Sequence, residues 1–502
     1  MVTAGQDEAT RTAALETADA LVVRSATKVT SALIARAPRL RVVARAGTGV
    51  DTIDVEAATA RGILVINAPG ANSVSVAELT LALALALVRH VPAADASMKT
   101  GRWEKTRFTG DELQGRTLGL IGFGRIGREV AQRARAFDMT VVTADPYLSP
   151  EAAESGGASL VTLDDLLARA DVISLHAPNT SETRQIINRD TLSRVKKGAR
   201  LINTARGELI DTAALVEALQ AGQLAGAAID VFDVEPTTDH TLQSLPQVIA
   251  TPHIAASTRE GQERVGLDTV DALCEFLARG IVRNAVNAPA LPPAIAGRIA
   301  PLLPVAQRFG QVAAALVPGP LSSVGIRAYG DLAALAPRPL ADAILTGLFT
   351  TMLAEGVSPV NVRTIAGERG VEIVESQSSR AHSHVDVVSL KLWSGTTVRW
   401  LEAAFTPGRG GRLVRIDDVL LDAPLSGTLL VIWNSDEPGV IGRVGTIAGE
   451  CGLNIASFSL GRHEGGAVGV VNLDLEPGDE PRLAEAMARI KDLPAIKDVR
   501  RV

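Results

Sequence analysis

The chain has 502 residues, of which 46% are apolar and 21% charged, as in an ordinary globular protein. It carries 50 basic and 56 acidic residues, a net charge of −6, and only 3% aromatic residues. This balance argues against a nucleic-acid-binding protein, and the composition excludes a disordered chain. The two cysteines, Cys274 and Cys451, are far apart and predict neither a disulfide framework nor a thiolate zinc site.

The N-terminal region predicts no membrane segment and no secretion signal. The longest strongly apolar run, Leu79 to Val88, is flanked by charged residues and is too short to span a bilayer. The first residues are polar and acidic, so we expect a cytoplasmic protein without a membrane partner. The run lies inside a longer segment, Ser73 to Arg89, that we interpret as a buried helix.

The first 290 residues alternate short β-branched runs with segments of helical periodicity, such as Val161 to Ala170 and Asp211 to Ala221. Strands separated by helices predict parallel sheets built from βαβ crossovers. The predicted strands are ALVVRS, RVVARAG, GILVINA, TLGLIGFG, MTVVTAD, ADVISLHAP, ARLINTA, GAAID and QVIATPH.

A stretch rich in proline and alanine at residues 285–304 marks a domain boundary. Residues 305–425 mix Ala/Leu helices with strands such as VEIVES, VDVVSLKL and TVRWLEAAF, without a motif that carries chemistry. Residues 427–502 read strand, helix, strand, strand, helix, strand, which is a βαββαβ ferredoxin-like order.

A glycine-rich turn follows the apolar run TLGLI. Gly122, Gly124 and Gly127 form a G-x-G-x-x-G pattern that leads into a helix. The next predicted strand ends in Asp145, about 20 residues further on, as in dinucleotide-binding units. Its carboxylate would accept hydrogen bonds from ribose hydroxyls and repel a 2′-phosphate. These features predict NAD, and not NADP, as the cofactor.

Three further residues suit the oxidation of a hydroxy acid. His253 follows a proline at the end of an apolar strand and has the side chain best suited to take up a hydroxyl proton. Glu235 would hold the imidazole and stabilise its protonated form. Arg206 would bind the substrate carboxylate through both guanidinium nitrogens.

The segments GFGRIGREVA, NTARGELID, AAIDVFDVEP and ATPHIAAST, with VRSATKVT, ARAGTGVDTIDV, ANSVSVAE and GRWEKTRFTGDELQGRTLG, resemble the D-isomer-specific 2-hydroxyacid dehydrogenases. The resemblance covers essentially the whole chain and is to the long members with intervening and ACT regulatory domains. It implies NAD-dependent oxidation of D-3-phosphoglycerate to 3-phosphohydroxypyruvate, the first step of phosphorylated L-serine biosynthesis.

The resemblance also implies the domain organisation. A Rossmann-like doubly wound NAD-binding domain at residues 69–254 is inserted in a flavodoxin-like substrate-binding domain at residues 1–68 and 255–288. An α+β intervening domain at 289–425 and a ferredoxin-like ACT domain at 427–502 follow. A first strand and helix of the substrate-binding domain are expected to be absent, which would expose an edge of its sheet.

Site residues follow from the matching positions. His253, Glu235 and Arg206 take the catalytic roles given above, and Asp230 contacts the nicotinamide carboxamide. His176 lies at a strand end beside the cofactor and has no role in proton transfer. The other implied cofactor contacts are Thr48, Arg125, Ile126, Ala177, Thr204, Ala205 and Ala255. The implied substrate-phosphate contacts are Arg24, Arg45 and Lys105, with Arg107 as a rival to Lys105.

The ACT domain implies regulation by L-serine and assembly into a homo-oligomer, a tetramer in the family. Asn434, Asp436 and Asn454 match the effector positions, and Ser435 or Asp436 is expected to cap the first ACT helix. His382, His384 and Asp386 alternate along a predicted strand, which we interpret as a solvated face, and we expect no metal site.

Two alternatives remain open. One is a dehydrogenase for a different D-2-hydroxy acid, such as glycerate or 2-hydroxyglutarate. The other is a non-catalytic protein that senses NAD on the same fold. Comparing the activity on phosphoglycerate with that on its unphosphorylated analogue would distinguish the first alternative. Replacing His253 would distinguish the second, because only an enzyme would lose turnover while it still binds NAD.

Overall fold

The computed structural model describes residues 8–289, 291, 293–331, 337–353, 356–378, 386–406 and 410–502. The chain forms two compact units. Unit 2 consists of residues 68–268, and unit 1 combines residues 1–67 with residues 269–502. Helix α11, Arg259–Arg279, runs across the boundary at residue 268, whereas the sequence analysis places a domain boundary at residue 254.

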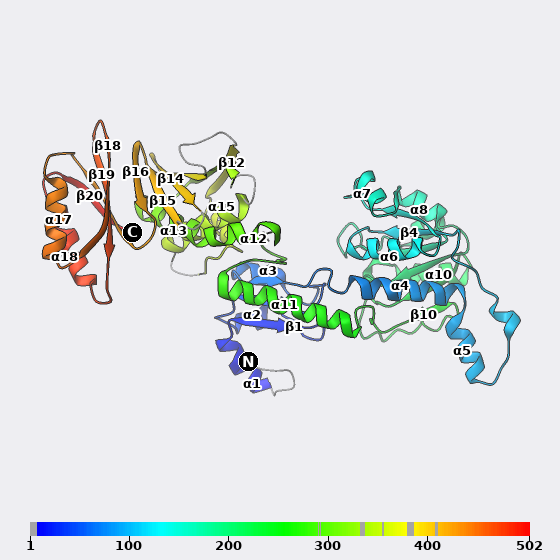
Figure 1. Ribbon diagram of the computed structural model, residues 1–502. Coiled ribbons are helices and arrows are strands. Elements are labelled where there is room, and N and C mark those ends of the chain that lie inside the picture. The colour runs from blue at the N-terminus through cyan, green and yellow to red at the C-terminus, as the bar shows by residue number, and fades with distance from the viewer. Residues whose placement is uncertain are drawn as a thin grey trace. The chain divides into compact units, whose positions relative to one another are not determined.

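Unit 2 is built on a seven-stranded parallel sheet with the order β10-β9-β8-β7-β4-β5-β6 (Figure 1). The winding direction reverses between β4 and β7, which are hydrogen-bonded neighbours, so the sheet is doubly wound as predicted. Loops after the carboxyl ends of these strands meet at one edge of the sheet. The strands are β4 Thr117–Ile121, β5 Thr140–Ala144, β6 Ser159–Leu160, β7 Val172–Leu175, β8 Ala199–Asn203, β9 Leu224–Ile229 and β10 Val248–Ala250.

Helices cover both faces of this sheet, which explains why its strands read as continuous apolar runs. One apolar cluster joins α4 and α6 to one face, and a second joins α8, α9 and α10 to the other. The helices of unit 2 are α4 Ser73–Val88, α5 Val91–Lys99, α6 Arg125–Arg135, α7 Pro150–Ser155, α8 Leu163–Arg169, α9 Arg189–Arg194 and α10 Thr212–Gln220, with the 3-10 turns η1 Lys105–Phe108 and η2 Gly207–Leu209.

Helix α4 confirms the buried helix predicted from its apolar run, because Leu83, Ala84 and Leu87 are buried in the first cluster. No single helix of the described residues is long and apolar enough to cross a membrane. Only α4 and α5 taken together, with a 65° bend between them, reach that length and composition.

The N-terminal part of unit 1 is a small parallel α/β layer. Strands β1 Ala20–Val23, β2 Val42–Arg45 and β3 Leu64–Ile66 pair in sequence order, with β1 at one edge. Thr30 and Asp54 cap the short helices α2 and α3. The helices are α1 Glu8–Thr17, α2 Ser31–Ala35 and α3 Val55–Ala60.

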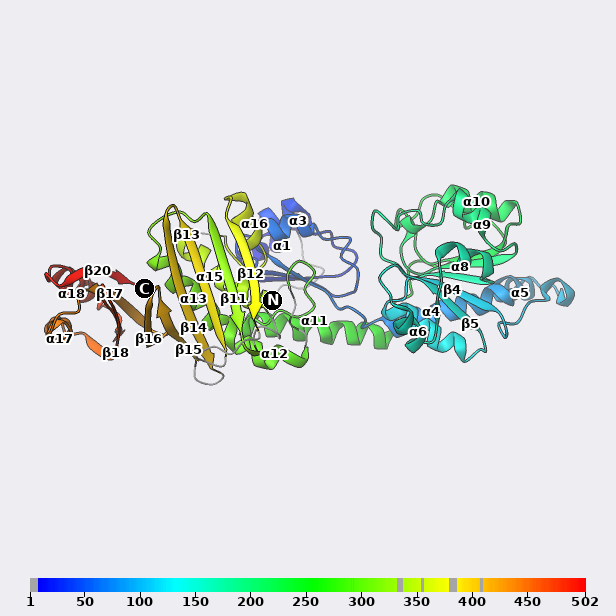
Figure 2. The same ribbon diagram turned by 90° about the horizontal axis from the view of Figure 1, so that it is seen from above.

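Residues 293–424 form a six-stranded mixed sheet, order β12-β11-β13-β14-β15-β16, packed against the helix pair α13 and α15 (Figure 2). The two helices approach closely at two glycines. A Cβ on Gly310 would lie 2.0 Å from the Ile344 carbonyl, and one on Gly347 would lie 1.8 Å from the Gln307 carbonyl. The elements are α12 Pro293–Ile299, η3 Ala300–Leu302, α13 Leu303–Leu316, β11 Ser323–Tyr329, α15 Pro337–Met352, α16 Val362–Glu368, β12 Glu372–Ser378, β13 Val387–Ser394, β14 Thr397–Thr406, β15 Gly410–Ile416 and β16 Val419–Pro424.

Residues 427–502, the ACT-like unit, confirm the predicted βαββαβ order. The antiparallel sheet has the order β18-β19-β17-β20, and both helices pack on one face of it (Figure 1). The opposite face joins the apolar cluster of the preceding six-stranded sheet through Leu429, Val431, Val468 and Val470. The elements are β17 Thr428–Asn434, α17 Val440–Glu450, β18 Asn454–His463, β19 Gly466–Asp474, α18 Glu480–Lys491 and β20 Ile496–Arg501.

One local prediction is wrong. Helix α17 begins at Val440 after Gly439, which adopts a left-handed conformation with φ 88°, and no side chain caps it. Ser435 instead donates to the Glu437 carboxylate, and Asp436 accepts from Arg462. The segment before the helix therefore forms a polar loop, and its hydroxyl and carboxylate have partners outside the helix end.

Of the three residues considered for a metal, His382 and His384 lie outside the described residues. In the part of the chain that the structure describes, no group of three His, Cys, Asp or Glu side chains is placed to hold a metal ion.

Candidate active site

The predicted cofactor and catalytic residues of unit 2 all follow the carboxyl ends of its parallel strands. The glycine turn follows β4, Asp145 follows β5, and His176 follows β7. Thr204 to Arg206 follow β8, Asp230 follows β9, and His253 follows β10. Since ligands of open parallel sheets bind outside these ends, one edge of the sheet collects the whole set.

The glycine turn is shaped to take a dinucleotide. Gly122 has φ 94°, and a Cβ there would lie 2.7 Å from the His176 carbonyl oxygen. A Cβ on Gly127 would lie 2.6 Å from the Gly122 carbonyl oxygen, so the helix packs directly on the turn. A Cβ on Gly124 would meet no atom within 4 Å. Space therefore opens at the N-terminus of α6, which no side chain caps, and a pyrophosphate fits there.

Asp145 supports the turn through backbone hydrogen bonds. Its carboxylate accepts the Phe123 N–H at 2.9 Å and the Tyr147 N–H at 3.0 Å. The Tyr147 hydroxyl donates to the Glu182 carboxylate at 3.0 Å, and this hydrogen bond raises the pKa of Tyr147. A carboxylate has about four lone-pair sites, so Asp145 retains acceptor capacity for ribose hydroxyls. Glu182 adds a second negative charge close to it.

His253 and Glu235 form the predicted pair. The Nδ1 atom of His253 lies 2.6 Å from the Glu235 carboxylate, whose other oxygen accepts the Phe232 N–H at 3.0 Å. A carboxylate only accepts, so Nδ1 carries the proton and Nε2 is left as the basic nitrogen. The side chain of His253 is 47% exposed and therefore accessible to a substrate.

The backbone of His253 is held in an unusual conformation. Its φ is 53°, in the left-handed region that non-glycine residues rarely adopt and that is found mainly at functional sites. The buried carboxylate of Asp230 fixes this loop by accepting the N–H groups of Ile254 and Ala255, each at 2.9 Å, and the Thr251 hydroxyl. The Asp230 carbonyl also accepts the His253 N–H at 2.8 Å. Asp230 thus acts on the histidine loop in addition to its predicted cofactor contact.

Arg206 lies in a turn that its neighbours stabilise. The Asn203 side chain donates to the Arg206 carbonyl at 2.7 Å and accepts the Ala205 N–H at 3.0 Å. Arg206 itself donates to the Ala205 carbonyl at 2.7 Å. A Cβ on Gly207 would lie 2.1 Å from the carbonyl carbon of Phe232, so only glycine lets the Arg206 turn approach the segment before Glu235.

His176 is a poor candidate for the base, which agrees with its predicted role. Burial lowers the pKa of His176 to about 3, so the ring stays neutral at working pH. Its Nε2 atom lies 2.9 Å from the Ser174 hydroxyl. Its backbone, together with the Ala177 N–H, lies directly against Gly122 and shapes the cofactor turn.

The remaining cofactor positions of unit 2 contact α4, its apolar cluster or the chain just before it. The Thr204 hydroxyl lies 3.0 Å from that of Thr80 on α4. Ile126 packs against the apolar cluster of α4 and α6. Arg125 donates to the Pro69 carbonyl and covers Gly70, at the point where the chain enters unit 2.

The predicted phosphate contacts fall in both units. Arg24 directly follows β1 of unit 1, and Arg45 is the last residue of the neighbouring strand β2, where it pairs with Val23. Thr48 lies in the loop after β2. Lys105 begins η1 in unit 2 and is exposed. Its rival Arg107 pairs with Glu104 at 3.2 Å. No ion pair of Lys105 occurs among the residues that the structure describes, which favours Lys105 as the cation available to a ligand.

The predicted effector residues divide between two ends of the ACT-like sheet. The Asn434 side chain accepts the Asp436 N–H at 2.9 Å, and Asp436 pairs with Arg462. Asn454 lies at the far end of β18, where it donates to Asp474 at 3.0 Å. Within one chain the structure therefore joins Asn434 and Asp436 but not Asn454.

Sequence reasoning missed three residues of the site: Asn203, Gly207 and Thr251. Each lies within or directly beside a quoted motif, so its position was visible. Their roles were not, because they act through backbone groups of loops that pack together only in the folded unit.

A doubly wound nucleotide unit with an arginine, a Glu–His pair and a glycine turn at one sheet edge defines the class of NAD-dependent 2-hydroxyacid dehydrogenases. Residues 81–255 match the family "D-isomer specific 2-hydroxyacid dehydrogenase, NAD binding domain". Residues 298–417 match "D-3-phosphoglycerate dehydrogenase intervening domain".

Two similar curated proteins are the D-3-phosphoglycerate dehydrogenases of Bacillus subtilis and Methanocaldococcus jannaschii. The first is 40% identical and the second 41% identical to this chain, over 96% and 97% of it, and the alignments cover 92% of each relative. This chain belongs to the D-3-phosphoglycerate dehydrogenase family.

A solved structure of the same fold is D-lactate dehydrogenase from Aquifex aeolicus, complexed with NAD and lactic acid. It is 34% identical, with a TM-score of 0.51, and the match covers 56% of this chain and 90% of that one. The chain is thus an NAD-dependent oxidoreductase.

Proposed function

We propose that the chain oxidises D-3-phosphoglycerate to 3-phosphohydroxypyruvate with NAD, the entry step to L-serine. The observation that carries this proposal is the His253–Glu235 pair at 2.6 Å, on the same sheet edge as the glycine turn. The pair supplies a positioned base, and the turn supplies the cofactor site. The D-3-phosphoglycerate dehydrogenases among its relatives support the choice of substrate.

Arg206, His253 and Glu235 have different roles in the proposed reaction. Arg206 binds the substrate carboxylate and orients the hydroxyl-bearing carbon. His253 Nε2 takes the hydroxyl proton as the carbonyl forms, and Glu235 stabilises the resulting imidazolium. A bound NAD, held by the glycine turn at the N-terminus of α6, would supply the hydride acceptor for the same carbon. Alcohol and NAD⁺ would then balance ketone and NADH, with the hydroxyl proton left on His253.

Three cationic side chains support the proposal that the substrate is phosphorylated. Arg24 follows β1 and Arg45 is the last residue of β2, so both lie at the carboxyl ends of adjacent parallel strands. Lys105 is an exposed cation of unit 2. We assign all three to the substrate phosphate, because a dianion needs more than one cationic partner.

The experiment is an NADH-absorbance assay with D-3-phosphoglycerate, D-glycerate, D-2-hydroxyglutarate and D-lactate at matched concentrations. We expect kcat/KM for D-3-phosphoglycerate to exceed that for D-glycerate by at least about 100-fold, as for loss of charge-assisted bonds. Equal activity on glycerate would select the alternative dehydrogenase. Cofactor binding without turnover of any of the four substrates would select the NAD-sensing protein.

We further propose a cytoplasmic homo-oligomer, a tetramer, that L-serine inhibits through Asn434 and Asp436 of one chain and Asn454 of its partner. The separation of these residues within one chain supports a site shared between two chains. Light scattering would give the oligomeric state. Titration of initial rates with L-serine, against the variant Asn434→Ala, would test the effector site, and unchanged rates at millimolar serine would refute it.

A further inference from the structure

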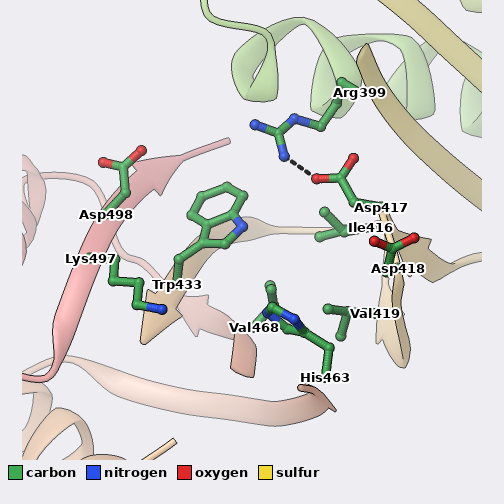
Figure 3. A pocket seen from close by; sticks show the side chains of 10 residues that line it. All are labelled: Arg399, Ile416, Asp417, Asp418, Val419, Trp433, His463, Val468, Lys497 and Asp498. Carbon is green, nitrogen blue, oxygen red and sulfur yellow. Dashed lines mark hydrogen bonds and ion pairs between the residues drawn. The ribbon is translucent and has the colours of Figure 1, made fainter. Parts of the chain in front are cut away.

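A cavity of about 460 Å³ lies in unit 1 between the ACT-like sheet and the turn that joins β15 to β16 (Figure 3). Its volume falls in the range of sites that hold small organic molecules. It is lined on the sheet face that α17 and α18 leave uncovered, by side chains of β17, β18, β19 and β20. No motif of the sequence analysis points to it, and Asn434, Asp436 and Asn454 are not among the residues that line it.

One part of the lining is apolar. Ile416, Val419 and Val468 contribute aliphatic side chains, and Trp433 contributes a half-buried indole. In Figure 3 the indole ring stands between the Lys497 and Asp498 side chains and the turn at Asp417 and Asp418. Arg399 lies 5.5 Å from the ring centroid and pairs with Asp417, so the position of the ring is fixed on one side.

A second part of the lining offers hydrogen-bond donors. The Lys497 ammonium donates to the Gly465 carbonyl at 2.7 Å and retains two more protons. The Gly465 N–H donates to His463 Nδ1 at 3.1 Å, so the neutral ring carries its proton on Nε2. Lys497 and His463 are both exposed, both line the cavity, and both form a hydrogen bond with the Gly465 backbone. Together they suit a carboxylate.

A third part of the lining offers a carboxylate of its own. Asp417 is occupied by Arg399 and by the Trp400 N–H at 2.9 Å. Asp498 is occupied by the Val499 N–H and by Arg500, each at 2.9 Å. For Asp418, no hydrogen bond or ion pair occurs within the described ranges of the chain, and its side chain is exposed in the turn. Asp418 is therefore the acceptor left for a ligand cation.

The formal charges select the ligand class. Two cations, Arg399 and Lys497, face three carboxylates, so the lining as a whole disfavours a phosphate dianion. A zwitterion meets a donor group and an acceptor group at once, and an apolar side chain would occupy the wall around Trp433. We propose that this cavity binds a free α-amino acid with an apolar side chain, its carboxylate at Lys497 and His463 and its ammonium at Asp418.

Isothermal titration calorimetry of the full-length chain with L-leucine and L-phenylalanine tests the proposal. The matched probes are L-leucinamide, which lacks the carboxylate, 4-methylpentanoate, which lacks the ammonium, and inorganic phosphate. We expect saturable binding of at least one amino acid and at least about 10-fold weaker binding of both truncated probes, the loss of one charge-assisted hydrogen bond. This readout involves no turnover, so it is independent of the proposed reaction.

Two variants locate the binding. Lys497→Met and Asp418→Asn should each weaken it about 10-fold. Lys491→Met and Asp492→Asn, at the exposed end of α18, should leave it unchanged. Circular dichroism would verify that all four variants are folded. Absence of heat with both amino acids up to about 10 mM, binding that survives both cavity substitutions, or preferential binding of phosphate would overturn the proposal.

Discussion

Unit 2 and the C-terminal part of unit 1 bring polar side chains together in different ways. In unit 2, the cofactor and catalytic residues follow the ends of parallel strands, so they lie at one edge of the sheet. In the C-terminal part, the cavity at Trp433 is lined from two sheets of mixed or antiparallel strands. In a parallel sheet, residues that follow successive strands thus lie close together in space. A site between two sheets is formed by residues from several segments, and no single motif predicts it.

The first test of this comparison removes the proposed bidentate contact between Arg206 of unit 2 and the substrate carboxylate. Arg206→Lys should lower kcat/KM for the hydroxy acid about 100- to 1,000-fold, because an ammonium cannot reproduce the guanidinium fork. Steady-state NADH formation measures the effect. The exposed Arg189, paired with Glu217 in the same unit, gives the matched control Arg189→Lys, which should retain full activity. Equal rates for the two variants would remove Arg206 from the site.

The second prediction concerns the cofactor edge. Asp145→Ser should raise the ratio of kcat/KM for NADP to that for NAD about 10- to 100-fold, because the charge that repels a 2′-phosphate is lost. Glu182→Gln removes the neighbouring charge but leaves Asp145 in place, so its shift should be smaller. An unchanged ratio in Asp145→Ser would mean that the carboxylate only supports the glycine turn.

The third prediction tests the close approach that builds the Arg206 turn. Gly207→Ala should destabilise the chain by about 1–3 kcal/mol, because the added methyl group meets the Phe232 backbone. Gly266→Ala in α11 adds a methyl group in open space and should change stability by no more than about 1 kcal/mol, in the stabilising direction. Urea midpoints compare the two. Similar midpoints would contradict the tight packing.

The fourth and smallest effect is the pH dependence due to His176. The pKa of His176 is about 3 in the folded chain, against the ordinary histidine value of 6.5 in the unfolded chain. Below pH 6.5 the unfolded chain therefore binds a proton that the folded chain does not. Stability is therefore lost as the pH falls, by about 1.4 kcal/mol per pH unit for this group. His176→Gln should flatten the curve between pH 6.5 and about pH 5. An unchanged slope would show that the ring is protonated in the folded state.

Much of unit 2 could be predicted from its sequence, because the hydrophobic pattern of the strands and the polar residues that follow them indicate the same fold. The six strands predicted in unit 2 all form, and the short β6 is added to them. Helix α4 is buried, and the Glu235–His253 contact exists. The spacing of glycines after an apolar run specifies a turn that a nucleotide fits. From β7 to β10 the motifs lie along the sheet edge in chain order, whereas Asp145 after β5 lies on the other side of the glycine turn after β4.

Other features depend on tertiary contacts that no local pattern records. Asp230 fixes the His253 loop through backbone N–H groups, and Gly207 is required by the Phe232 backbone. The loop before α17 has the polar residues of a helix cap, yet they bind Arg462 and Glu437 instead. The C-terminal cavity was not predicted, because Asp418, His463 and Lys497 come from three segments that are far apart in the sequence.

The central claim is that His253 Nε2 is the base of the dehydrogenase. Its most direct test measures NAD affinity and turnover on the same preparation of His253→Gln, with the exposed His240→Gln as the control. The account predicts a fall in kcat of about 100- to 10,000-fold with an unchanged Kd for NAD. Turnover within a factor of about two of the His240→Gln control would contradict it.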